Sequence, residues 1–234
     1  MVISLNSKRI IPVLLGTALL LTLINIVVLY FGFHSERRMV EMLANIFDFD
    51  YEGTVPAFFS AVVLLFNAIV LAINYRKSRF NSDGNSFYWG SLSLTFGFLA
   101  IDEASRIHEN FSDVFELFMD SGGLLYFLWV IPYGIATFLL GLFYLRFLWR
   151  LPSATRRRFI VAGIILLTGA IAFDMLGGLE AETYGFNNVV YCALYTIEEF
   201  LEMLGSILFL SALLRHLGPI SLTLGEPSPP PPED

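Results

Sequence analysis

Apolar residues occur in long, nearly continuous runs along this chain, separated by short polar segments. A helix needs about 20 apolar residues to cross a bilayer, and six of the runs reach that length. Spanning strands would need alternating apolar and polar residues, which these runs lack. The pattern predicts an all-α, polytopic membrane bundle of six helices at Ile10–Phe33, Val55–Tyr75, Phe87–His108, Leu124–Leu148, Phe159–Leu179 and Val189–Leu214.

Two connecting segments have an apolar face at helical spacing. Between the first two spans, Met39, Met42, Leu43, Ile46 and Phe47 recur with a helical period, as in a helix that lies in the membrane interface. After the third span, a second short helix is expected to begin at a Ser112 cap and to end at Gly122-Gly123. We expect both helices to lie at headgroup level on the outer surface, and a partial lid over that surface is the alternative.

Composition supports a membrane protein, because 56% of residues are hydrophobic, only 15% are charged and the mean hydropathy is +0.68. The apolar run after Lys8 and Arg9 is longer than a signal-peptide core and is expected to remain as an uncleaved anchor. Residues 1–216 would form the membrane domain, and the proline-rich residues 217–234 a disordered cytoplasmic tail.

Charge distribution predicts the orientation. In a six-helix arrangement, all of the 14 Lys and Arg residues except Arg37, Arg38 and Arg106 fall on one side. The positive-inside rule then places both termini in the cytoplasm of a protein of the inner, or plasma, membrane. Most acids of this chain, whose net charge is −7, lie outside or within the membrane. An acidic outer face attracts cations and disfavours nucleic acid as a partner.

Ionisable residues also lie inside the predicted spans, where charge is costly and usually marks a site or an ion path. The helical period places Asp102, Arg106 and Glu109 on one stripe, and Glu198 and Glu202 on another that Tyr191 and Tyr195 extend as supporting residues. A polar core between the third, fifth and sixth helices would bring these groups together, with Arg106 as their charge partner. The candidate metal-binding or proton-binding residues are Asp102, Glu103, His108, Glu109, Asp174, Glu198, Glu199 and Glu202.

The chemistry of this set favours cation binding. Closely spaced carboxylates do not all ionise at low dielectric, so they either take up protons or bind cations. Carboxylates with one imidazole suit a divalent metal such as Fe, Mn, Zn or Ca. The paired Glu-x-x-His motifs of two-metal bundles are missing, and the lone Cys192 excludes a cysteine-based metal cluster.

Three interpretations remain open. The lead is an outward-open cation site, most simply for a divalent metal, and such a metal could support a reaction in the membrane. The second is a small proton-coupled or cation-coupled transporter that uses the same carboxylates. The third is an accessory subunit with a structural salt-bridge network, either as a homo-oligomer or in a larger membrane complex. Whether the protein is an enzyme is left undecided by the residues.

The stretch from Phe87 to Leu214 resembles a family of uncharacterised bacterial multi-pass membrane proteins. The segments that carry the resemblance are LAIDEASRIHE, WVIPYGI and TIEEFLEMLG. The resemblance covers over half of the chain and implies a six-helix membrane fold, but it implies no activity.

Overall fold

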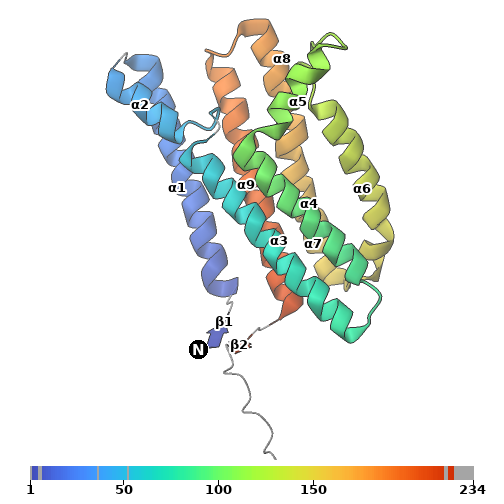
Figure 1. Ribbon diagram of the computed structural model, residues 1–234. Helices are drawn as coiled ribbons and strands as arrows, with labels where there is room; N and C mark the ends of the chain where they lie inside the picture. The colour runs from blue at the N-terminus through green and yellow to red at the C-terminus, as the bar shows by residue number, and fades with distance from the viewer. Residues whose placement is uncertain (1, 5–6, 36, 52, 219–220, 224–234) are drawn as a thin grey trace, which may run out of the picture.

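The chain forms an elongated bundle of helices (Figure 1). The computed structural model describes residues 2–4, 7–35, 37–51, 53–218 and 221–223. Two three-residue strands, β1 and β2, pair antiparallel next to the start of α1 and the end of α9. The elements are β1 (Val2–Ser4), α1 (Ser7–His34), α2 (Arg38–Phe47), α3 (Val55–Asn81), α4 (Ser86–Ser105), α5 (Ile107–Glu116), α6 (Val130–Arg150), α7 (Ser153–Leu167), the π-helix η1 (Thr168–Phe173), α8 (Asp174–Tyr184), α9 (Val189–Leu217) and β2 (Ser221–Thr223).

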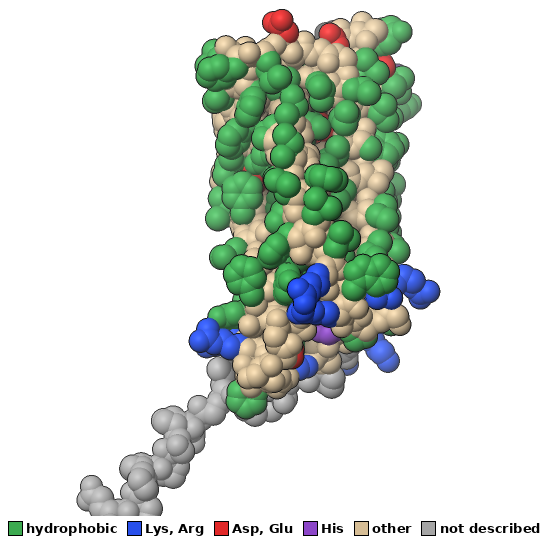
Figure 2. Space-filling model, turned by 90° about the vertical axis from the view of Figure 1, so that its right-hand side faces the viewer, with side chains coloured by type: hydrophobic (Ala, Val, Ile, Leu, Met, Phe, Trp, Pro, Cys, Tyr) green, Lys and Arg blue, Asp and Glu red, His purple; other side chains and the backbone are tan. Residues whose placement is uncertain are grey.

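Four helical segments are long and apolar enough to cross a membrane: α1, α3, α6 and the continuous segment Ser153–Tyr184 formed by α7, η1 and α8. Helices α4 and α9 have 20 and 29 residues, and acidic residues interrupt their apolar sequences. Hydrophobic side chains cover the middle of the face drawn in Figure 2, Lys and Arg gather at one end, and Asp and Glu appear toward the other. These features indicate a membrane protein. We call the two ends of the bundle the basic end and the acidic end.

Helix α9 lies at the centre of the bundle and packs against α1, α3, α7, η1 and α8. Two of its contacts are so close that only glycine fits. A Cβ on Gly205 would lie 2.5 Å from the Leu166 nitrogen, and a Cβ on Gly169 of η1 would lie 2.7 Å from the Glu198 carbonyl oxygen. Small residues allow such backbone approach between helices in a membrane. The seam between α7–η1 and α9 is therefore fixed at two points.

Side chains and turns set the helix boundaries. The Thr54 hydroxyl accepts a hydrogen bond from the Ala57 N–H at the start of α3, and the Asn188 side chain accepts one from the Tyr191 N–H at the start of α9. These caps satisfy backbone donors that have no partner within the helix. Gly218, with φ at 77°, ends α9 in a conformation that glycine adopts without strain.

The structure corrects several sequence-based boundaries, and the fourth span begins at Val130 instead of Leu124. The third predicted span does not continue to His108, because Arg106 adopts left-handed φ of 57° and ends α4 at Ser105. The short helix after it begins at Ile107, so Ser112 lies inside α5 and does not cap it, and α5 ends at Glu116 before the expected Gly122-Gly123. The amphipathic helix expected between the first two spans is present as α2. At the other end of the chain, α9 extends through Leu217 and β2 occupies Ser221–Thr223 of the predicted tail, whereas residues 219–220 and 224–234 lie outside the described residues.

Candidate functional site

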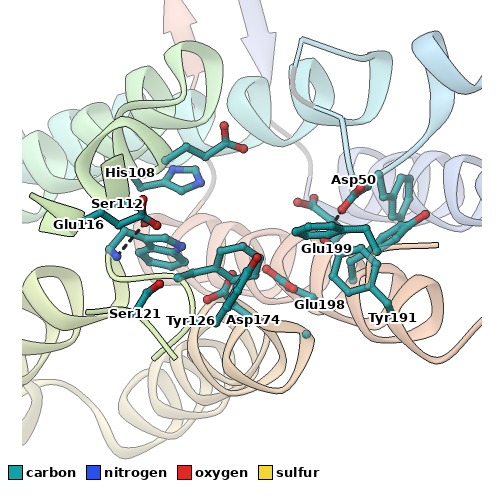
Figure 3. Close-up of a pocket in the computed structure, with 17 residues that line it drawn as sticks. Asp50, His108, Ser112, Glu116, Ser121, Tyr126, Asp174, Tyr191, Glu198 and Glu199 are labelled. Atoms are coloured by element: carbon teal, nitrogen blue, oxygen red, sulfur yellow. Dashed lines mark hydrogen bonds between the residues drawn. The ribbon is translucent and has the colours of Figure 1, made fainter. Parts of the chain in front are cut away.

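An acidic cavity opens near the acidic end of the bundle, and we call it the wide cavity. Its volume is about 440 Å³. Figure 3 shows His108 and Glu116 of α5 on one side, Asp50 and Tyr191 on the opposite side, and Asp174 and Glu198 between them. Aromatic rings form much of the remaining wall, including Phe49, Tyr126, Phe127, Trp129, Phe186 and Tyr195.

A second, smaller cavity of about 160 Å³ lies against the same wall, and we call it the narrow cavity. Its acidic lining comes from Asp102 and Glu103 of α4, Asp174 of α8, and Glu198, Glu199 and Glu202 of α9. Apolar side chains of α3, α4, α7 and η1 and the hydroxyl residues Tyr133 and Thr137 of α6 also line it. The wall shared by the two cavities consists of His108, Trp129, Asp174, Glu198 and Glu199. Helices α4, α5, α8 and α9 thus all deliver ionisable groups to the region where the two cavities meet, and we call this region the junction.

Asp102 stabilises the break between α4 and α5. Its side chain is buried, and its Oδ1 accepts a hydrogen bond from the backbone N–H of His108 at 2.8 Å. The Nδ1 atom of the His108 ring lies 3.3 Å from the same oxygen. The ring also packs edge-on to Trp129, with centroids 5.0 Å apart. Asp102 therefore positions the imidazole where both cavities meet.

Asp174 is a deeply buried acid of the junction. It is 7% exposed, and its Oδ2 is buried with no hydrogen-bond partner among the described residues. The π-helix η1 ends directly before it, and π-helical turns are rare and frequent at functional sites. The close contact of Gly169 with the Glu198 carbonyl ties η1 to α9 at this level. Local packing thus holds an unsatisfied carboxylate oxygen beside the α9 glutamates.

The loop between α2 and α3 closes one side of the wide cavity. The Tyr191 hydroxyl donates to Asp50 Oδ1 at 2.6 Å, and the Tyr195 hydroxyl donates to Asp48 Oδ1 at 2.9 Å. Burial raises the pKa of Asp48 and of Asp50 above the ordinary value, because desolvation disfavours the charged form. The tyrosines of α9 therefore anchor this acidic loop at the cavity.

A third hydrogen bond ties the loop between α2 and α3 to helix α1. Asn25 is fully buried, its amide donates to Thr196 Oγ1 at 2.9 Å, and its Oδ1 accepts the N–H of Phe49 at 3.1 Å. One side chain thus links α1, α9 and the loop that carries Asp50.

The structure brings most of the predicted site residues to the junction, but it removes Arg106 from it. Arg106 and Glu109 form an ion pair of 2.8 Å in which both side chains are about half exposed. Glu109 lines the wide cavity and Arg106 lines neither cavity. The predicted stripe of Asp102, Arg106 and Glu109 is wrong, because the break at Arg106 changes the helical phase.

Sequence reasoning missed Asp50, Glu116 and Trp129 as cavity residues. The acids of the FDFDYEG segment follow an amphipathic helix and alternate with aromatic residues, which is a signal that could have marked them. Within the described parts of the chain, no group of three or more His, Cys, Asp or Glu side chains is arranged to hold a metal ion.

The fold and the site define a helical membrane protein with an acidic cavity at one end of its bundle. The model of the family described as "Domain of unknown function (DUF8692)" matches residues 13–217, and the chain belongs to this family. Searches of curated proteins and of solved structures give no match for the chain.

Proposed function

We propose that the chain crosses the membrane six times, with α4 and α9 as the two further spans and both termini in the cytoplasm. The position of α9 between α1, α3 and α7 supports this, as does the packing of α4 on α3. The separation of basic and acidic ends supports the orientation, because cytoplasmic loops are rich in Lys and Arg. The wide cavity would then open away from the cytoplasm, at the outer face of the plasma membrane.

We further propose that the wide cavity binds cations, with Asp174 as the central ligand. The observation that carries this proposal is the buried Asp174 Oδ2, which has no partner among the described residues although it faces two acidic cavities. A buried carboxylate is costly unless a proton or a cation compensates it. No Lys or Arg is among the described residues that line the wide cavity.

A divalent metal fits the chemistry of the lining. Carboxylate oxygens and one imidazole are the groups that bind Mn, Fe, Zn and Ca in proteins. The volume of about 440 Å³ leaves room for bound water, since each water occupies about 30 Å³ of liquid. We therefore propose that the metal binds with part of its hydration shell, since no three acid or imidazole side chains of the described residues are arranged to hold it directly.

Proton-coupled or cation-coupled transport is the second candidate, and one observation favours it. The narrow cavity continues from Asp174 and Glu198 to Asp102 and Glu202, so acids form a series from the wide cavity into the bundle. Chains of acids of this kind serve as proton relays in transporters. In this case the same carboxylates would alternate between protonated and cation-bound states.

The test is metal binding by the purified full chain. Elemental analysis without chelator, followed by calorimetric titration with Mn²⁺, Zn²⁺ and Ca²⁺, should give about one site per chain. Asp174→Asn and Glu199→Gln should each weaken binding at least about tenfold, which corresponds to the loss of about 1.4 kcal/mol. Glu180→Gln is the matched control, since Glu180 also lies in α8 but lines neither cavity.

The outcomes separate the candidates. Binding that depends on Asp174 but not on Glu180 supports the cation site. Vesicle uptake of the cation that follows an imposed pH gradient, and that Asp174→Asn abolishes, selects transport. No binding of any of the three ions at millimolar concentration contradicts the proposal, and a changed stability of Asp174→Asn in that case supports a structural network.

A further inference from the structure

A basic pocket lies at the opposite end of the bundle from the acidic cavities. Its volume is about 320 Å³, and it lies between α7 and α9. Three arginines surround it, Arg157 and Arg158 from α7 and Arg215 from α9. Its floor is apolar and includes Val161, Leu208 and Ala212.

Helix geometry explains why these residues share one groove. Arg157 and Arg158 precede Val161 by four and three positions, and Leu208, Ala212 and Arg215 follow one stripe of α9 at spacings of four and three. Along the seam, the backbones come closest at Gly205 and Leu166, which lie further from the basic end. On the core side of the seam, the rings of Phe159 and Phe209 pack with centroids 4.6 Å apart. The groove therefore faces outward from the bundle.

The charge of the groove is uncompensated within the described part of the chain. All three arginines are exposed, no described Asp or Glu lines the pocket, and no ion pair joins the three arginines to other described residues. Three guanidinium groups around one pocket repel each other unless an anion binds between them. The Lys and Arg side chains of this end border the hydrophobic band of the bundle (Figure 2).

We propose that this groove binds one anionic phospholipid, with its phosphate between the three arginines and an acyl chain along Val161, Leu208 and Ala212. Guanidinium groups bind phosphate oxygens through paired hydrogen bonds and are weakly hydrated, which suits a site at the membrane interface. Basic pockets between membrane helices recognise anionic headgroups in this way. The apolar floor and the 47% exposure of Val161 match a lipid tail and offer nothing to a free phosphate ion.

This proposal rests on the membrane location and is independent of the cation site. The proposal predicts a specific order of affinity among phospholipids. A lipid with two phosphates, such as diphosphatidylglycerol, should bind more tightly than phosphatidylglycerol, because it presents more negative charge to the same three arginines. Phosphatidylcholine, whose headgroup has no net charge, should bind weakest.

Native mass spectrometry of the detergent-purified full chain, titrated with each of these three lipids, tests the proposal. Removing one arginine should weaken binding of the anionic lipids about fivefold, and Arg157→Gln/Arg158→Gln/Arg215→Gln should weaken it about 100-fold. The matched control is Arg146→Gln/Arg150→Gln, which removes two basic residues of α6 that lie outside the pocket. Control binding should stay within about twofold of wild type.

A second variant keeps the charge. Val161→Trp fills the floor at an exposed position and should weaken lipid binding at least about tenfold without affecting the arginines. Equal affinity for the anionic and the neutral lipid, or equal loss in the control, would overturn the proposal. Competition by millimolar inorganic phosphate that displaces the lipid completely would also overturn it, by assigning the pocket to a free anion.

Discussion

Gly205 provides the sharpest test of how α7 and α9 pack. In Gly205→Ala, the new Cβ would lie 2.5 Å from the Leu166 nitrogen and 2.7 Å from its Cα and Cβ atoms. Carbon atoms normally approach to about 3.5–4.0 Å. Because the atoms in the way belong mostly to a helix backbone, no side-chain rotation relieves the contact. The two helices must separate by about 1 Å.

The expected loss of stability follows from two opposing effects. Overpacking of a well-packed interior costs about 1–3 kcal/mol, and a clash between backbones belongs at the upper end of that range. Alanine is better than glycine in a helix by up to about 1 kcal/mol, which offsets part of the cost. The separation also loosens Met203, Ile207 and Leu210, which are almost fully buried beside Gly205. We expect a net destabilisation of about 2 kcal/mol.

Unfolding of the purified protein by SDS, followed by circular dichroism, measures this difference. Gly163→Ala is the matched control, because it makes the same change within α7 where no other atom lies within 4 Å of the new Cβ. The control should be neutral or stabilised by up to about 1 kcal/mol. If the two variants were equally stable, the close seam between α7 and α9 would be refuted.

Three further predictions concern the acidic end. Asn25→Ala leaves the N–H of Phe49 buried without its acceptor and should destabilise the chain by about 2 kcal/mol in the same assay. Burial raises the pKa of Asp48 and Asp50, so their contribution to stability is complete below about pH 4 and is lost as pH rises through the raised values. The pH profile of unfolding should therefore fall less steeply above pH ~4 in Asp48→Asn/Asp50→Asn, and identical profiles would contradict this assignment. Gly169→Ala places a Cβ 2.7 Å from the Glu198 carbonyl oxygen of α9 and should weaken Mn²⁺ binding about tenfold. Gly163→Ala, the control for the α7–α9 seam, should bind Mn²⁺ as the wild type does.

The sequence predicts the positions of the helices well because long apolar runs are a local signal. A helix occurs in each of the six expected segments, and α2 occurs where an amphipathic helix was expected. The break at Arg106 was not predictable from that signal. It depends on Asp102, whose carboxylate accepts the His108 N–H and so begins a new helix where the apolar pattern alone continues.

The acids of the junction could be listed from the sequence, but their surroundings could not. Asp50 lies in a loop that has no periodicity, and it joins the cavity through a hydrogen bond to Tyr191, which is 141 positions away. The π-helix before Asp174 depends on packing of Gly169 against α9. Contacts between distant segments determine both features, and no window of sequence contains them.

Two kinds of acid meet at the acidic end, and the difference between them argues for a site. Asp48, Asp50 and Asp102 each accept hydrogen bonds that fix a loop or a helix corner, which is the expected behaviour of structural buried acids. Asp174 lies between these fixed parts with a carboxylate oxygen that no described group satisfies. A purely structural network would be expected to satisfy Asp174 as well, because it is as buried as Asp48. The satisfied acids thus form a rigid frame, and the unsatisfied one is placed where a cation or a proton can reach it from the wide cavity.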